Sequence, residues 1–127
     1  MSTLHWFEIP VEDIRRAVAF YERVLGVEMR VLDLTEQLGS WIGMLPNRGG
    51  VGGALVQNSQ HGYVPSKAGT LVYLVVDGDL AQALARAEGA GGQVLLPKTP
   101  LGEGEGGGFT AWIADTEGNR VGLFSAQ

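Results

Sequence analysis

One carboxylate, Glu8, interrupts the apolar stretch WFEIPV, residues 6–11. A strand of this composition must turn the charge either to solvent or into a cavity, because burying an unpaired carboxylate is costly. In a cavity, Glu8 could anchor a ligand or act as a catalytic general base. The alternative is a structural hydrogen bond to a neighbouring strand or to an arginine. Glu8 is therefore the first candidate for a catalytic or ligand-binding residue.

The chain offers few other groups for metal or nucleophilic chemistry. It contains no cysteine, so histidine, aspartate and glutamate are the strong metal ligands that remain. His5 opens the strand of Glu8 and His61 stands in a polar segment, and for both an ordinary structural imidazole is the alternative. Glu103 and Glu105 belong to the loop GEGEGG, which could reach a cation or close over a cavity, with solvated charge as the alternative. Its G-x-G-x-x-G spacing does not indicate a phosphate site, because a strand follows it.

Aromatic residues near the end of the chain could line a binding surface. If TEGN, residues 116–119, closes a hairpin, the pairing places Phe109 on the same strand face as Gly122 and Phe124. Phe109 and Phe124 are then predicted to be ligand-binding residues. Ordinary apolar packing is the alternative for both.

The elements that would position these residues occur twice along the chain. A strand over 7–11 is followed by a helix that begins after Asp13, an N-cap, and ends at Gly26. The same order returns from residue 69, with Asp79 as the second N-cap. Three strands rich in β-forming residues follow each helix, over 27–34, 40–46 and 52–57 and then over 91–97, 108–115 and 119–125. Trp41 and Trp112 stand in matching WI pairs, and we interpret them as core packing under the two helices.

Length, composition and charge limit the class of protein. The 127 residues predict a single domain made of two repeats, about 1–57 and 69–127, joined by a linker over 58–68. A net charge of -5 with nine scattered Lys and Arg argues against a nucleic-acid partner. No apolar run approaches the roughly 20 residues of a membrane span and no signal peptide opens the chain, so a soluble cytoplasmic protein without a membrane partner is expected.

Three features of the chain resemble a known family. They are the βαβββ unit that occurs twice, the segment PVEDIRRAVAFYERVLG after the first strand, and the segment DTEGNRVGLF near the end. The chain resembles, over essentially its whole length, the glyoxalase, bleomycin-resistance and extradiol-dioxygenase superfamily, also called vicinal oxygen chelate proteins. The resemblance implies an α+β fold of two tandem βαβββ modules, with curved mixed sheets, helices on the outer face and a ligand cavity on the inner face. It also implies a homodimer, because relatives complete their cavities by pairing modules within or between chains.

Strand alternation then sorts the side chains of the first strand. Phe7 and Ile9 are expected under the helix, so Trp6 and Glu8 point into the cavity. By the repeat, Leu71 and Tyr73 take the equivalent places in the second module. The predicted ligand-binding residues are Trp6, Glu8, Tyr73, Phe109 and Phe124.

Metal-dependent relatives place one ligand on each of four strands. Carried over to this chain, those positions fall on Trp6, Leu71, Gly122 and either Gly52 or Gly53, none of which can coordinate a metal. A shift of one residue would bring in His5, but it would turn that strand over and supply one ligand of the three or four required. The resemblance therefore implies the scaffold of a metal site without its ligands.

Three functions remain open at this level. The favoured one is a protein that binds a small organic molecule in a metal-free apolar cavity, with Glu8 as an acidic anchor and no cofactor. The second is a lyase or isomerase resembling glyoxalase I, or a dioxygenase-like enzyme, which would use a divalent metal or Glu8 as a base. The third is a regulatory or interaction domain with a vestigial pocket.

Overall fold

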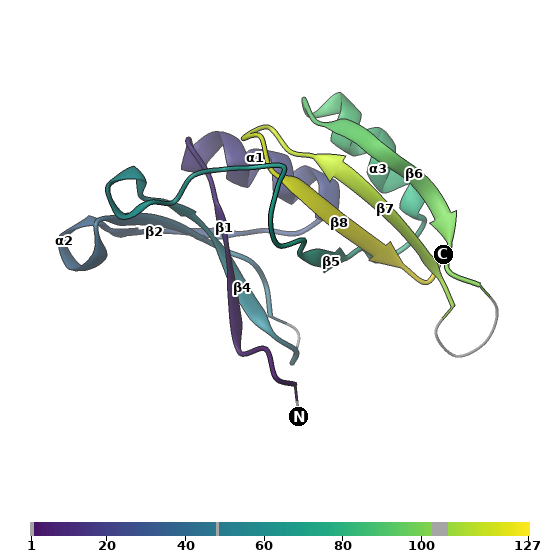
Figure 1. Cartoon of the computed structure of the whole chain (residues 1–127), viewed down its shortest axis with the longest axis horizontal. Coiled ribbons are helices and arrows are strands. Elements are labelled where there is room, and N and C mark those ends of the chain that lie inside the picture. The colour runs from purple at the N-terminus through teal and green to yellow at the C-terminus, as the bar shows by residue number, and fades with distance from the viewer. Residues whose placement is uncertain (1, 48, 103–106) are drawn as a thin grey trace.

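The computed structural model describes residues 2–47, 49–102 and 107–127 and confirms the α+β class. The strands form two four-stranded mixed sheets, one from each half of the chain (Figure 1). Glu103 and Glu105, which were predicted to form an acidic loop, lie outside the described residues.

The first module contains β1 (Trp6–Pro10), α1 (Ile14–Leu25), β2 (Arg30–Leu34), α2 (Thr35–Leu38), β3 (Ser40–Met44) and β4 (Gly52–Gln57). Its sheet has the order β1-β4-β3-β2, in which β1 pairs with β4 in parallel and the other neighbours are antiparallel. The single-turn helix α2 was not anticipated from the sequence.

The second module repeats this plan with β5 (Tyr73–Val75), α3 (Leu80–Gly89), β6 (Gln93–Pro100), β7 (Phe109–Ala114) and β8 (Arg120–Ser125). Its sheet order, β5-β8-β7-β6, has the same parallel first pair. Between the modules the chain forms the short 3-10 helix η1 (Ser59–His61) and then crosses to β5. The predicted duplication of the βαβββ unit is thus present in the topology.

Helix α1 starts and ends, and helix α3 starts, where the capping signals indicated. The side chain of Asp13 accepts hydrogen bonds from the backbone N–H groups of Arg15 and Arg16, and that of Asp79 accepts one from Ala81. Gly26 ends α1 with a φ of 67°, a left-handed conformation that glycine adopts without strain.

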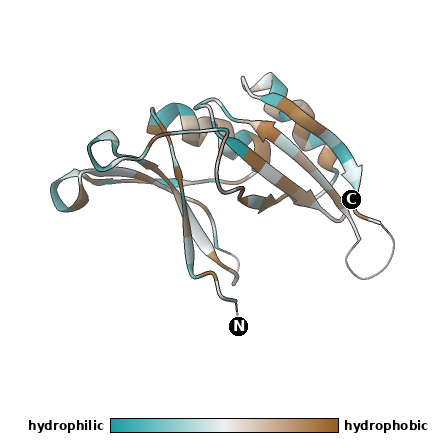
Figure 2. Ribbon diagram, in the orientation of Figure 1, coloured by the Kyte–Doolittle hydropathy of each residue, from teal (hydrophilic) through white to brown (hydrophobic). Residues whose placement is uncertain are grey.

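The hydrophobic core lies between the two helices and the faces of the sheets that they cover. α1 also packs against α3, and the two helices lie side by side in Figure 1. Figure 2 shows hydrophilic and hydrophobic segments mixed along both helices, as expected for helices with one buried face. The buried helical side chains are Ile14, Ala17, Val18, Phe20, Tyr21 and Val24 of α1 and Leu80, Ala83, Leu84 and Ala87 of α3.

The turn between β7 and β8 fastens the second module to the first. Glu117 accepts hydrogen bonds from the backbone N–H groups of Glu12 and Asp13, each at 2.9 Å, and from Nε of Arg16 at 2.7 Å. These donors lie where β1 passes into α1, and the Glu117 side chain is fully buried among them. A carboxylate near a helix N-terminus is favourable electrostatically, so the contact stabilises both the helix and the junction.

Asp115 forms the second part of the same junction. Its Oδ2 accepts hydrogen bonds from the Tyr21 hydroxyl at 2.6 Å and the Asn119 amide at 2.9 Å. Its Oδ1 accepts from the backbone N–H groups of Glu117 and Asn119, each at 2.8 Å. Burial and the adjacent Asp115 charge raise the pKa of the Tyr21 hydroxyl well above its ordinary value, so this group stays a neutral donor.

β1 has the predicted alternation. Ile9 is buried and Phe7 packs against the core, whereas Trp6 and Glu8 lie on the opposite, exposed face. We call this face of each sheet, turned away from the helices, the inner face. The placement of Trp6 and Glu8 on it is confirmed.

Two glycines beside aromatic rings give a matched stability prediction. A Cβ at Gly53 would overlap the ring of Phe7, which is packed against the core, so Gly53→Ala is expected to lower the free energy of unfolding by about 2 kcal/mol. A Cβ at Gly122 would meet the ring of Tyr73, which is 50% exposed and is not packed in the core as Phe7 is, so Gly122→Ala is expected to cost less, about 1 kcal/mol. Urea denaturation of both variants measures the difference, and equal losses would contradict the assigned faces.

No helix within the described ranges is long and apolar enough to cross a membrane.

Candidate functional site

The inner face of the first sheet presents the carboxylate of Glu8. Glu8 Oε1 accepts a hydrogen bond from the Tyr63 hydroxyl at 2.6 Å, and Oε2 receives a longer one, 3.4 Å, from the indole Nε1 of Trp6. Tyr63 comes from the segment between the modules. The hydrogen bond to Glu8 raises the pKa of the Tyr63 hydroxyl, with smaller contributions from burial and from the Glu8 charge. Both contacts orient a carboxylate that remains accessible to a ligand.

Tyr73 and Trp112 form a polar-tipped aromatic pair on the inner face of the second sheet. The indole Nε1 of Trp112 donates a hydrogen bond to the Tyr73 hydroxyl oxygen at 2.9 Å. Gly122 lies between them in the sheet, opposite Tyr73 in one strand pair and opposite Trp112 in the other. The glycine leaves room for the Tyr73 ring to lie against the backbone of β8.

The β7–β8 register corrects one predicted site residue. Thr110 lies opposite Phe124, and Phe109 lies opposite Ser125. Phe109 is therefore on the helix side of the sheet and not on the inner face. It packs against the core, and its ring centre lies 4.3 Å from the Lys98 Nζ. Phe124 keeps its predicted place on the inner face.

Asp115 causes this difference. The predicted hairpin closed with a loop of residues 116–119, but the backbone N–H of Asp115 donates to the carbonyl of Asn119, and the pairing of strands begins at Ala114 and Arg120. The loop is one residue longer than expected, and a shift of one residue turns every side chain of β7 to the other face. The same shift corrects the interpretation of Trp112, which lies on the inner face and not in the core.

Trp41 keeps the interpretation given to it from the sequence. It packs against the core on the helix side, opposite Gln57, whereas Trp112 lies opposite Gly122. The two tryptophans are therefore not equivalent in the repeat.

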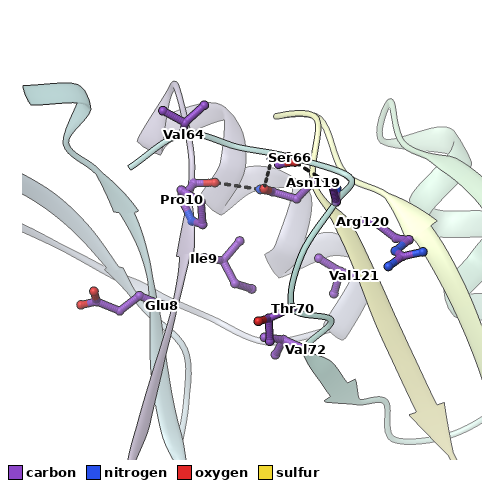
Figure 3. A pocket seen from close by; sticks show the side chains of 11 residues that line it. Glu8, Ile9, Pro10, Val64, Ser66, Thr70, Val72, Asn119, Arg120 and Val121 are labelled. Carbon is purple, nitrogen blue, oxygen red and sulfur yellow. Dashed lines mark hydrogen bonds between the residues drawn. The ribbon is translucent and has the colours of Figure 1, made fainter. Parts of the chain in front are cut away.

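A groove of about 130 Å³ lies between the two modules (Figure 3). It lies between β1 and β8 beneath the segment that leads to β5, with Ile9, Val72 and Val121 among its apolar walls. Glu8 and Arg120 also border it, but Figure 3 shows their charged groups turned away from each other. A volume of this size is below the range of most ligand pockets and would hold only part of a molecule.

The inner faces themselves are open. Trp6 is 39% exposed, Tyr73 50% and Val75 69%. Large apolar side chains are thus exposed on the inner faces of both sheets, which makes these faces candidate binding surfaces.

The residues at the expected metal positions do not fit a divalent ion. Trp6 pairs with Gly52 and Tyr73 with Gly122, and Leu71 lies just before β5, so these positions offer no carboxylate or imidazole. His5 is exposed, and the His61 ring contacts Asn58 at 3.1 Å. Across residues 2–47, 49–102 and 107–127, no three His, Cys, Asp or Glu side chains are grouped so that they could hold a metal ion.

Comparison with known proteins gives a consistent family. The model of the Glyoxalase/Bleomycin resistance protein/Dioxygenase superfamily matches residues 3–123. No curated protein matches the chain. A glyoxalase/bleomycin resistance protein from Albidiferax ferrireducens is similar in structure, with a TM-score of 0.67 at 14% identity over 98% of both chains.

Two further solved structures share the fold. A virulence protein from Salmonella typhimurium has a TM-score of 0.66 at 16% identity, covering 100% of this chain and 98% of that one. A glyoxalase I variant from Zea mays has a TM-score of 0.66 at 21% identity, covering 96% of this chain and 46% of that one.

Proposed function

The chain belongs to the glyoxalase/bleomycin resistance protein/dioxygenase superfamily, and we propose that it binds a small organic molecule on its inner faces without a metal ion. Two observations together support this proposal. The Glu8 carboxylate is accessible and oriented, and the side chains at the expected metal positions have no metal-binding atoms. Aromatic side chains with few polar groups on the inner faces suit binding of an organic ligand.

Glu8 is the proposed anchor of the ligand. Its carboxylate already accepts hydrogen bonds from Tyr63 and Trp6, which hold it in one orientation, and an ionised carboxylate has lone pairs left for a further donor. A cationic or hydrogen-bond-donating group on the ligand would occupy them. Trp6, Tyr73 and Phe124 would supply apolar contact, and burial of each aromatic ring contributes roughly 1.5 to 3 kcal/mol before the costs of binding.

We also propose that a second copy of the chain covers the inner faces in a homodimer. The exposure of Trp6, Tyr73 and Val75 leaves both faces open in one copy, and the groove between the modules is too small to enclose a ligand alone. Pairing of two copies would place aromatic side chains of one against the Glu8 face of the other.

The test begins with a screen of small amines and amides by thermal shift, since a ligand that binds the native state must raise its melting temperature. For a molecule found in this way, Glu8→Gln is expected to weaken binding at least about tenfold in calorimetry, because a charged acceptor is lost. Glu28→Gln, a change at an exposed acid on the loop before β2, serves as the control and should leave affinity unchanged.

Two results would count against the proposal. Equal affinity of the wild type and the Glu8→Gln variant would remove the anchor. Stoichiometric retention of Zn, Ni, Mn or Fe after dialysis against those ions would favour the metal-dependent lyase or isomerase instead. Light scattering on the same samples reports whether the ligand binds a dimer.

A further inference from the structure

Arg120, the first residue of β8, has a donor that no group of the described chain satisfies. Its Nε is buried and has no hydrogen-bond partner among the described residues. The other half-buried cations are paired: Arg86 donates to the carbonyls of Arg23 and Val24, and Lys98 forms an ion pair with Asp79 at 3.0 Å. A buried donor without an acceptor is unfavourable, so a small turn of the Arg120 side chain that brings Nε to an acceptor outside the chain would be favourable.

The surroundings hold the guanidinium in place without neutralising it. Its central carbon lies 5.5 Å from the ring centre of Trp112, within the range of a cation–π contact. The Trp112 ring is itself fixed by its hydrogen bond to Tyr73, and the backbone N–H of Arg120 donates to the Ser66 carbonyl at 3.3 Å. Arg120 is therefore a preorganised cation on the inner face of the second sheet, beside aromatic rings.

The charge of the second sheet's inner face favours a group with a single negative charge. Glu8 does not neutralise Arg120, because the two charged groups point apart (Figure 3). The planar guanidinium fork matches a carboxylate through two parallel hydrogen bonds. A phosphate ester carries close to two charges, whereas Arg120 is the one Lys or Arg among the described residues of β5, β7 and β8.

We propose that Arg120 binds the carboxylate of a small ligand whose flat apolar part lies on Tyr73, Trp112 and Phe124. This inference rests on the proposed function, since it specifies the chemical class of the molecule held by the inner faces. The ligand would then carry two polar groups: a carboxylate that binds Arg120 on the second sheet, and a hydrogen-bond donor or cation that binds Glu8 on the first.

Matched pairs of acids and amides test this assignment. Benzoate is compared with benzamide, and indole-3-acetate with indole-3-acetamide, by calorimetry and by the NMR signal of the Arg120 Nε–H group in the full-length protein. Each acid is expected to bind at least tenfold more tightly than its amide and to shift that signal. In the Arg120→Met variant, the affinities for each acid and its amide should differ by less than threefold. Arg30→Met makes the same change of charge on the inner face of β2 and should leave the preference for acids intact.

The outcomes separate this inference from the proposed function. Equal binding of acids and amides by the wild type would overturn the role of Arg120 but leave the binding function standing, whereas no binding of any member would overturn both. A preference for acids that survives Arg120→Met would place the cation elsewhere. Because Arg120 forms no ion pair with any residue that the structure describes, Arg120→Met should melt no lower than the wild type. A lower melting temperature together with a halved mass in light scattering would instead place the acceptor in a second copy of the chain and overturn the proposal.

Discussion

Replacing Asp115 with alanine is expected to lower the free energy of unfolding by about 4 kcal/mol, enough to remove much of the stability of a domain of this size. The carboxylate is buried and accepts hydrogen bonds from the Tyr21 hydroxyl, the Asn119 amide and two backbone N–H groups. The alanine variant leaves the buried Tyr21 hydroxyl and the N–H groups of Glu117 and Asn119 without this acceptor. It also loosens the β7–β8 turn, which contacts the first module through Tyr21. Urea denaturation followed by tryptophan fluorescence measures the loss.

Two comparison variants separate the hydrogen bonds from the lost charge. Tyr21→Phe removes one donor and leaves the carboxylate with three, so it is expected to cost about 1 kcal/mol. Glu88→Ala, at an exposed acid on α3, changes the net charge equally and should change stability by under about 0.5 kcal/mol. A loss below about 1 kcal/mol for Asp115→Ala would show that the turn does not hold the two modules together.

Glu117→Gln is expected to destabilise the protein by about 2 kcal/mol at pH 7, and the difference should vanish in acid. Burial by itself would raise the pKa of Glu117, but the hydrogen bonds from Arg16, Asp13, Thr116 and Glu12 outweigh it and hold the pKa below the ordinary value of 4.5. A carboxyl group with a lowered pKa in the folded state stabilises the protein at pH values above its unfolded pKa. That contribution is lost as the pH falls through the lower, folded pKa.

The pH dependence distinguishes this charge from a purely steric effect. Stability of the wild type and of Glu117→Gln is compared by urea denaturation from pH 7 down to pH 2.5. The two curves should begin to converge as the pH falls below 4.5 and should meet below the lower, folded-state pKa of Glu117, where the wild-type side chain is also neutral. A constant difference across the whole range would assign the loss to packing. Arg16 is 48% exposed in its side chain, so part of its attraction to Glu117 is screened by water and added salt should narrow the difference at pH 7.

The local patterns of the sequence predicted most of the elements. Asp13, Gly26 and Asp79 marked helix ends that the structure confirms, because capping involves only a residue and the backbone within a few positions of it. The alternation of residues 6–9 assigned Trp6 and Glu8 to the exposed face of β1, because successive side chains of a strand point to opposite faces. The order of strands and helices in the two modules followed from the internal repeat.

The composition of the site was predictable only in part. Glu8 was found because its charge interrupts an apolar strand, but its partner Tyr63 is 55 positions away and no pattern indicated the contact. Arg120 was not singled out from the sequence, although strand alternation places it on the same face as Gly122 and Phe124. The signal for Arg120 was present, but its lack of an acceptor could be recognised only from the folded chain.

The sequence by itself determined the order of the strands and the two long helices, the starts of both long helices and the end of the first, the inner face of β1, and the residue types at the four expected metal positions. Only the tertiary structure decided that Trp112, and not Phe109, faces inward, and that Asp115 and Glu117 dock one module onto the other. The reason is the range of the interactions involved. Caps and alternation depend on neighbours within a few residues, whereas the docking depended on contacts across about a hundred residues of chain. The hairpin register is local too, but turn residues are compatible with more than one loop length, and the Asp115–Asn119 hydrogen bond made the loop one residue longer than expected.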